Sequence, residues 1–218
     1  TLGPFIVKKE YRNQGYGTQI WQSAMALIQD NPTIILHAVP LQIPRYQKQG
    51  FESQYINQGW TLRNTLSREK EPFTEAQSIT PEWLPAVIHY DKTIFGASRK
   101  KLLTEVLKLS CVHSVLLDNE GQVTGFGLIR PCRDGYRVGP LFADTPEQAK
   151  QIFSYLIKMV DEDKIIVDIP QKNPFSNLFV EYFGLKAISE GETNAMLKGE
   201  NIEQNFDKNY GVFSLEIG

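Results

Sequence analysis

A glycine-rich turn near the start of the chain lies between an apolar run and a helical pattern. The run is Phe5-Ile6-Val7, and the turn reads Arg12-Asn13-Gln14-Gly15-Tyr16-Gly17-Thr18. Apolar residues then recur at helical spacing from Ile20 to Ile28. Two glycines let a backbone approach an anion closely, and the first-turn amides of a helix have no intrahelical partner. The pattern predicts a strand, an anion-binding loop and a helix, although a plain glycine-rich turn would look the same.

Composition restricts the class of protein. Of the 218 residues, 41% are apolar and 22% are charged, and no apolar run approaches the length of a membrane span. The 23 basic and 25 acidic residues nearly balance, so we expect neither nucleic acid nor a membrane as a partner. Two cysteines, Cys111 and Cys132, without a recognisable secretory segment are typical of a reducing, cytoplasmic setting. His37, His89 and His113 lie far apart, so no metal site is expected.

Helix and strand signals continue along the chain and repeat in a similar order. We expect strands at 34–38, 51–62, 112–117, 122–131, 136–142, 165–169, 194–198 and 212–217, and helices at 43–49, 81–90, 99–109, 145–161 and 176–183. The stretch 67–80 is polar and punctuated by proline, as linkers are. These patterns predict an α/β (α+β) fold of two similar units, mixed sheets flanked by helices, with the first unit incomplete. The predicted divisions are 1–66, the linker 67–80, and 81–218.

A second motif follows the strand at 34–38 and reads Arg45-Tyr46-Gln47-Lys48-Gln49-Gly50-Phe51. Together with Arg12-x-x-Gly15-x-Gly17 it resembles motifs B and A of the GNAT family of N-acetyltransferases, over residues 5 to about 62. The resemblance implies acetyl-CoA as co-substrate. It places the pantetheine arm on the backbone of Phe5, Ile6 and Val7, and the pyrophosphate on Arg12, Asn13, Gln14, Gly15, Tyr16, Gly17 and Thr18.

The resemblance also gives Tyr46 the role of the general acid that protonates the departing thiolate. A phenol suits this role because its pKa near 10 keeps it protonated at neutral pH. The residues alone equally allow Tyr46 to pack within an amphipathic helix. In one departure from the family, Gln42-Ile43-Pro44 stands where many relatives carry an asparagine. In another, the early strands that build much of the acceptor pocket are missing.

The second half resembles the C-terminal domain of tandem GNAT proteins of the YitH type. The resemblance rests on Phe95-Gly96-Ala97-Ser98-Arg99, Val138-Gly139-Pro140-Leu141-Phe142-Ala143, Met196-Leu197-Lys198-Gly199 and Ser214-Leu215-Glu216-Ile217-Gly218. Usual members carry Asp where Ser98 stands. Arg-x-x-Gly-x-Gly is replaced by Ala143-Asp144-Thr145-Pro146-Glu147, whose acidic groups would repel a pyrophosphate. We therefore expect a poor cofactor site here, with a structural or acceptor-binding role.

No general base for the acceptor amine can be identified from the sequence. His37 lies in the middle of a predicted strand, where a packed histidine is the simpler interpretation. Glu10 is expected to be a solvated surface charge. Four residues could converge on a pocket at strand ends: Arg99, Arg130, Cys132 and Asp168. Arg99 could equally form a structural ion pair, and for Cys132 a buried small hydrophobic residue is the simpler interpretation.

The predicted function is transfer of an acetyl group from acetyl-CoA to an amine by direct attack. The acceptor would be a small-molecule or peptide amine, and the protein a monomer or a homodimer. One alternative is a non-catalytic acyl-CoA-binding or regulatory protein, and another is an inactive remnant. If turnover depends on Tyr46, the enzyme hypothesis is favoured over both alternatives.

Overall fold

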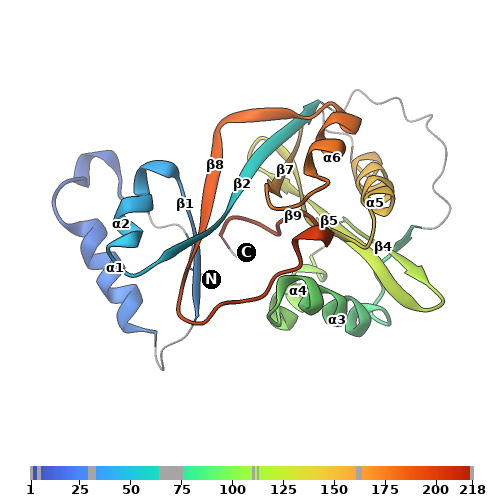
Figure 1. The fold of residues 1–218 in the computed structure, drawn as a ribbon, viewed down its shortest axis with the longest axis horizontal. Helices are drawn as coiled ribbons and strands as arrows, with labels where there is room; N and C mark the ends of the chain where they lie inside the picture. Colours follow the sequence, from blue (N-terminus) through green and yellow to red (C-terminus); the bar gives the residue numbers. More distant parts are fainter. Residues whose placement is uncertain are drawn as a thin grey trace.

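One mixed sheet runs through the computed structural model, which describes residues 2–3, 6–28, 33–63, 76–109, 111, 113–160 and 164–216 (Figure 1). Its strands within these residues are β1 (Ile34–Ala38), β2 (Glu52–Arg63), β3 (Gln77–Ser78), β4 (His113–Asn119), β5 (Gln122–Cys132), β6 (Gly135–Ala143), β7 (Lys164–Pro170), β8 (Lys186–Lys198) and β9 (Asn209–Gly211). Their order is β1-β8-β2-β7-β6-β5-β4-β3, and β9 pairs with β6. The β6–β7 pair is parallel and the other pairs are antiparallel.

The two faces of this sheet carry different helices. The helices are α1 (Tyr16–Ala26), α2 (Ile43–Gln47), α3 (Leu84–Phe95), α4 (Lys100–Val106), α5 (Pro146–Lys158) and α6 (Ser176–Phe183), with short 3₁₀ turns η1 (Lys9–Tyr11), η2 (Pro40–Gln42) and η3 (Phe206–Lys208). Neighbouring residues of β5 point to opposite faces, so Ile129 packs in the core under α5 and α6, and Leu128 in the core under α3 and α4. Strand register places α1 and α2 on the same face as α5 and α6.

Two long strands, one from each half of the chain, are interleaved. β8 lies between β1 and β2, while β2 lies between β8 and β7. The first residue of β1, Ile34, pairs with the last residue of β8, Lys198. In the same way the first residue of β7, Lys164, pairs with the last residue of β2, Arg63. The pairs β1–β8 and β7–β2 thus have the same antiparallel arrangement, and β2 and β8 each pair with a strand from the other half of the chain.

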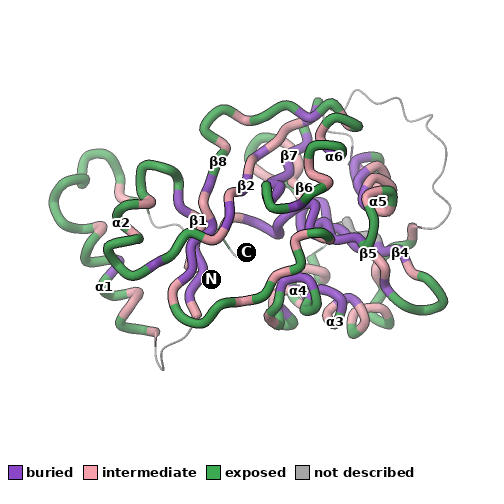
Figure 2. The backbone as a smooth tube through the Cα atoms, viewed as in Figure 1, coloured by how far each residue is buried: buried purple, intermediate pink, exposed green. Residues whose placement is uncertain are grey.

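Burial is uneven along the sheet. Figure 2 shows strands that are buried through the middle of the molecule, with α1 and α2 exposed along much of their surface. The described side chains of α1 include only one buried residue, Trp21, whereas α5 buries five of its thirteen residues. The helix α1 is therefore attached mainly through Trp21 and its aromatic neighbours.

Most of the expected elements are present. The strand at 34–38 and the helix at 176–183 have the predicted bounds, and β8 begins at Lys186 rather than at 194. The strand expected at 212–217 is wrong, because pairing with β6 occurs at Asn209–Gly211 and residues 212–216 are not in a strand. Ile6 and Val7 are also outside any strand. Part of the predicted linker, Gln77–Ser78, forms β3, while its residues 67–75 lie outside the described structure, as does Phe5.

Among the described residues, no helix is both long and apolar enough to cross a membrane.

Candidate active site

The predicted anion-binding loop forms a left-handed turn in front of α1. Gly15, which precedes the helix, has φ 85°. A residue with a Cβ is strained at such a φ, which explains the glycine. The amides of Thr18 and Gln19 donate to the Gly15 carbonyl at 3.0 and 3.1 Å and begin the helix. The amides of Tyr16 and Gly17 precede these bonds, and such first-turn amides can bind an anion.

A pocket of about 710 Å³ opens at this loop. Arg12 Nε donates to the Val7 carbonyl at 3.0 Å, which ties the loop back to the segment before it. Part of the wall comes from η2 and α2, through Gln42, Arg45 and Tyr46. The predicted site residues that line the pocket are Ile6, Val7, Arg12, Asn13, Gly15, Tyr16, Gly17, Thr18 and Tyr46. The fold thus brings both sequence motifs to one cavity.

Gln14 is the predicted loop residue that does not line the pocket. Its Nε2 donates to the Glu10 carbonyl at 3.0 Å, so its side chain stabilises the turn. Glu10 itself is exposed in η1, as expected for a solvated charge.

Tyr46 belongs to an aromatic cluster and also faces the pocket. Its ring centroid lies 5.5 Å from that of Trp21 and 6.0 Å from that of Phe51. Burial raises the pKa of the Tyr46 phenol, and the neighbouring Arg45 charge opposes this rise. Packing and acid catalysis are therefore compatible, because the cluster fixes the ring and keeps its hydroxyl protonated.

The turn before α5, where the sequence predicts a poor cofactor site, is occupied by its own side chains. Thr145 Oγ1 accepts from the Gln148 amide at 3.2 Å, and the Gln148 side chain accepts from the Thr145 amide at 3.2 Å. Asp144 accepts from Tyr90 at 2.7 Å and from Lys208 at 2.8 Å. This capping box and the carboxylate leave a helix start that is poorly suited to a pyrophosphate.

The gap between β6 and β7 beside that turn is filled by the C-terminal part of the chain. Gly211 of β9 pairs with Leu141 of β6, and the Val212 amide donates to the Asp168 carbonyl at 3.0 Å. Beyond β9, residues 212–216 continue over the face of the sheet that carries α3 and α4.

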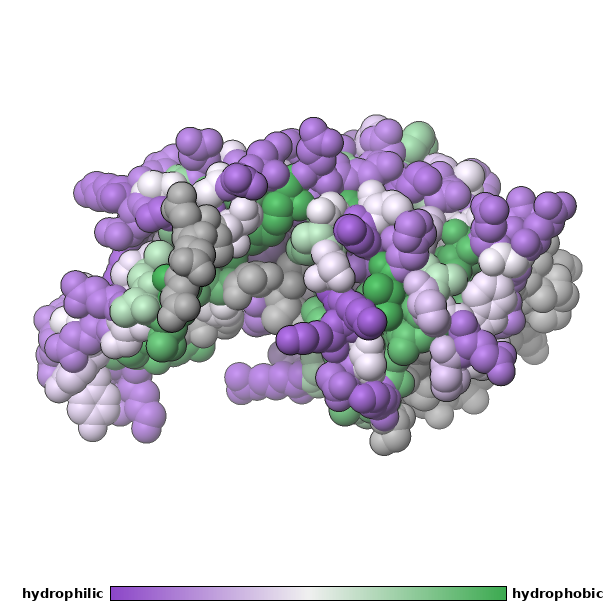
Figure 3. Space-filling view, turned by 90° about the horizontal axis from the view of Figure 1, so that it is seen from below, coloured by the Kyte–Doolittle hydropathy of each residue, from purple (hydrophilic) through white to green (hydrophobic). Residues whose placement is uncertain are grey.

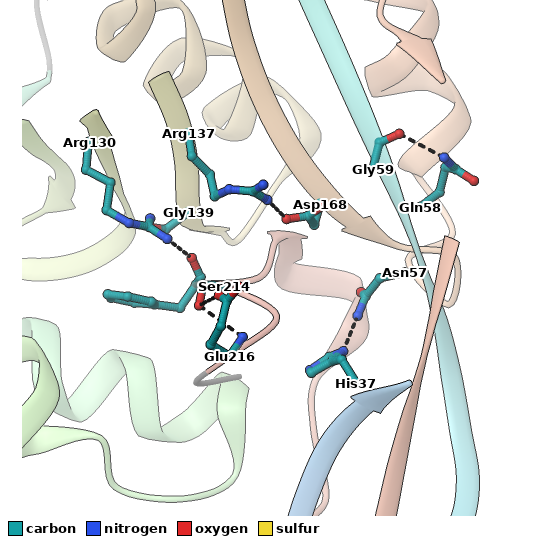
Figure 4. Close-up of polar contacts among 11 residues, drawn as sticks. His37, Asn57, Gln58, Gly59, Arg130, Arg137, Gly139, Asp168, Ser214 and Glu216 are labelled. Atoms are coloured by element: carbon teal, nitrogen blue, oxygen red, sulfur yellow. Dashed lines mark hydrogen bonds and ion pairs between the residues drawn. The ribbon is translucent and has the colours of Figure 1, made fainter. Parts of the chain in front are cut away.

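A row of polar side chains crosses this same face (Figure 4). We call it the polar face, defined by His37, Asn57, Asp168, Arg137 and Arg130. Asn57 Nδ2 lies 3.0 Å from His37 Nδ1, and Arg137 pairs with the Asp168 carboxylate. The guanidinium of Arg130 donates to two backbone carbonyls at 3.0 and 2.9 Å, one of them in the C-terminal segment. Arg130, Arg137 and Asp168 are thus paired, and the polar groups near His37 are less completely so.

His37 and Asn57 reach each other across β8. The β8 residue opposite His37 is Ala195, whose small side chain leaves room between the two strands. Burial lowers the pKa of His37 to about 4, and the negative charge of Glu216 opposes this shift only in part. The imidazole is therefore neutral at pH 7.

The family model described as "Acetyltransferase (GNAT) domain" matches residues 87–211, which is more than half of the chain. The chain belongs to the GNAT acetyltransferase family. It is 25% identical over 173 residues to the uncharacterized N-acetyltransferase YitH of Bacillus subtilis (strain 168), a match that covers 79% of this chain and 61% of YitH. It is 26% identical over 221 residues to holothin acyltransferase of Pseudoalteromonas sp. (strain SANK 73390), covering 99% and 72% of the two proteins.

A solved structure shares the GNAT fold of this chain. The structure of a putative acetyltransferase from Pyrococcus horikoshii has a TM-score of 0.80 and 24% identity, and the match covers 97% of this chain and 69% of that one. The chain thus spans about three fifths of the YitH sequence and about two thirds of the archaeal chain. Together these matches support the mixed α/β class predicted from the sequence.

Two of the four second-half residues considered for one pocket, Arg99 and Arg130, both face the Phe213 ring, at 5.8 and 5.0 Å, but the polar partners of the four residues differ. Arg99 forms a buried ion pair with Asp91 at 2.5 Å and stacks on Phe95 at 4.2 Å, so it is a structural ion pair. Asp168 pairs with Arg137. Cys132 is half-buried at the end of β5, and both it and the exposed Cys111 are free thiols.

Sequence reasoning did not identify Asn57, Arg137 or the C-terminal segment as parts of a site. The one available signal was Tyr55-x-Asn57-x-Gly59, a row of alternate positions in β2 that mixes polar and small residues where a core strand would be apolar. For metals, no group of three or more His, Cys, Asp or Glu side chains that could hold an ion occurs within the described part of the chain.

Proposed function

We propose that this GNAT protein transfers an acetyl group from acetyl-CoA to an amine. The observation that carries the proposal is the pocket in which the Gly15 loop, Val7 and Tyr46 meet. A first-turn anion site and a protonated phenol in one cavity are what cleavage of a thioester of a phosphorylated cofactor needs. A relative named as an acyltransferase supports the reaction type.

In this reaction the residues of the pocket have separate tasks. The amides from Asn13 to Thr18, with Arg12, bind the pyrophosphate, and the backbone near Val7 holds the pantetheine arm. The amine nitrogen attacks the thioester carbonyl carbon, so a C–N bond forms and the C–S bond breaks. Tyr46 gives its proton to the departing sulfur, and the amine loses one proton in exchange. No protein nucleophile is needed.

We also propose that residues 1–66 and 81–218 are two GNAT-like copies, with the cofactor bound by the first copy alone. The matching antiparallel arrangement of the β1–β8 and β7–β2 pairs supports two copies. The capping box at Thr145 and the strand β9 between β6 and β7 support a single cofactor site. The balance of charge and the cysteine usage favour a cytoplasmic protein acting on a small or peptide-borne amine.

The test is Tyr46→Phe in the full chain, with Tyr182→Phe as the matched control. Tyr182 is an exposed tyrosine on α6, far from the loop in sequence and outside the lining of its pocket. We expect Tyr46→Phe to lower thiol release from acetyl-CoA by roughly 100-fold or more, because a general acid contributes about that much. Both variants should retain the thermal stabilisation by acetyl-CoA.

Two results would count against this function. If millimolar acetyl-CoA does not raise the melting temperature of the wild type, the pocket is not a cofactor site. If acetyl-CoA stabilises the protein and no amine releases thiol, the non-catalytic acyl-CoA-binding alternative is correct.

A further inference from the structure

Three adjacent strands place unpartnered polar atoms on the polar face. They are His37 Nε2 on β1, Thr193 Oγ1 on β8 and Asn57 Oδ1 on β2, each buried and without a hydrogen-bond partner in the described structure. Thr193 lies directly opposite Asn57 in the strand register, so both side chains point to the same side. A buried polar group without a partner costs about 1 to 3 kcal/mol. A ligand that supplies both a donor and an acceptor would complete the hydrogen bonds of these three atoms.

The chemistry of the His37–Asn57 pair restricts the ligand. Asn57 is fully buried, and its amide can face His37 in either orientation. With the amide oxygen bonded to Nδ1–H, the His37 Nε2 atom is left as an acceptor and the Asn57 amide as a donor. In the other orientation, Nε2–H is the donor and the amide oxygen is the acceptor. Either way the pair offers one donor and one acceptor to a neutral group that has both, such as an uncharged amine.

The same pair disfavours a cation. The burial that keeps the imidazole neutral also penalises a buried ammonium group. The nearby carboxylate of Asp168 is already paired with Arg137, and Glu216 is exposed. A weakly basic amine, such as an arylamine, enters as the neutral molecule at pH 7 and avoids this cost.

Space for the body of such an amine adjoins the pair. A pocket of about 430 Å³, within the usual range for small-ligand sites, is lined on the sheet side by Ile35, Tyr55, Ala195 and Leu197. His37 and Asn57 lie behind Tyr55 and Ala195 and do not line it, and its charged lining residues are the exposed Lys172 and Glu203. The Tyr55 ring centroid lies 6.3 Å from that of His37 and 4.7 Å from that of Phe206. These aromatic walls suit a planar group. Seen from below, the surface is indented between the two ends of the molecule (Figure 3).

The strand β1 connects this region to the cofactor pocket. Leu36 and Ala38 point into the cluster that holds Tyr46, whereas His37 between them points to the polar face. β1 then leads directly into η2 and α2, which form a wall of the cofactor pocket. On the other side, the backbone of Glu216 approaches Gly3, where a Cβ would lie 3.8 Å from the Glu216 carbonyl oxygen. The two regions are therefore joined through β1, which contributes His37 to one and leads into the wall of the other.

We propose that the polar face is the acceptor site of the acetyl transfer, and that His37 and Asn57 bind the nitrogen of a neutral, weakly basic amine. This inference rests on the function proposed above. The nitrogen lone pair attacks the thioester carbonyl carbon as the C–S bond breaks, and Tyr46 protonates the sulfur. With the Asn57 amide oxygen bonded to His37 Nδ1–H, one N–H proton of the amine passes to the His37 Nε2 lone pair and on to water, and water returns a proton to Tyr46, so amine and thioester become amide and thiol.

The test uses the full chain with saturating acetyl-CoA and two probes, aniline and benzylamine, at pH 7. The variant is His37→Gln, which keeps a polar side chain, and the control is His89→Gln, an exposed histidine on α3. Thiol release, the ¹⁵N imidazole signals of the histidines and the thermal shift with acetyl-CoA are measured. We expect aniline to move the His37 signals and to release thiol faster than benzylamine. His37→Gln should lower release by about 100-fold, the usual effect of a misplaced nucleophile.

Each result has a distinct meaning. If millimolar aniline and benzylamine both leave the His37 signals unchanged, or if His37→Gln and His89→Gln release thiol equally, the acceptor site is not here. If benzylamine is the better substrate and moves the His37 signals, the neutral-amine class is wrong. The acetyl-CoA thermal shift should persist in His37→Gln. Its absence from the wild type would instead overturn the proposed function.

Discussion

Replacing His37 with Gln should remove much of the loss of stability of this protein in mild acid. The pKa of His37 falls from 6.5 to about 4 on folding, because burial in the folded state disfavours the charged imidazole. Between these values the unfolded chain binds more protons than the folded chain, so the free energy of unfolding decreases as the pH falls. The loss begins near pH 7, reaches about 2 kcal/mol at pH 5, and levels off at about 3 kcal/mol below pH 4.

The assay is urea unfolding at several pH values between 4 and 7.5 for the wild type, His37→Gln and His89→Gln. The readout is the difference in unfolding free energy between each variant and the wild type. This difference should change by about 2 kcal/mol between pH 7 and pH 5 for His37→Gln, and His89→Gln is the matched control at an exposed histidine. Glu216 and Tyr55, which face His37, are kept in every protein compared. Parallel curves for all three proteins would refute the buried, neutral imidazole.

Two further features of packing in the second half of the chain can be tested by urea unfolding, the close approach of Gly96 to Glu203 and the buried Asp91–Arg99 ion pair. Gly96 and Gly121 have φ values of 83° and 84°, but a Cβ at Gly96 would lie 2.2 Å from the Glu203 carbonyl oxygen, while one at Gly121 meets nothing within 4 Å. Gly96→Ala should therefore lower the free energy of unfolding by at least about 2 kcal/mol more than Gly121→Ala does. Equal losses would show that the backbone at Glu203 moves away to make room for the added methyl group. Asp91→Asn removes the carboxylate from the buried Arg99 and should cost about 3 to 5 kcal/mol. A cost below about 1 kcal/mol would contradict a structural ion pair.

Local signals were sufficient for the elements that depend on local physics. The loop before α1 was predictable because Gly15 supplies the left-handed turn, and the helix at 176–183 because Gly184 ends it. The start of β8 was not, since the polar stretch Ser189-Glu190-Gly191-Glu192 has no strand pattern of its own. This stretch is extended because β2 pairs with β8 from its first residue, with Thr61 opposite Lys186. Likewise, the apolar residues after Gly211 are buried without being in a strand, which periodicity cannot distinguish.

The candidate acceptor site escaped prediction for a similar reason. His37 and Asn57 are separated along the sheet by a strand from the other half of the chain, and only the small Ala195 lets them meet. The number of residues between His37 and Asn57 does not reveal that a strand from elsewhere in the chain lies between them in the sheet. The cofactor loop, by contrast, was visible because Arg12 to Thr18 are contiguous.

The interleaved strands also tie the proposed acceptor site to the whole chain. β1 and β2 come from the first predicted unit, while β8 and the C-terminal segment come from the second. Without β2, both β7 and β8 would lose a partner along most of their length and expose edges that invite aggregation. His37 would then have neither Asn57 nor the β8 residues that hold it in place. The pyrophosphate loop is one contiguous stretch, whereas the proposed acceptor site needs strands from both halves, so acceptor binding should be the more sensitive of the two when the interleaving is disturbed.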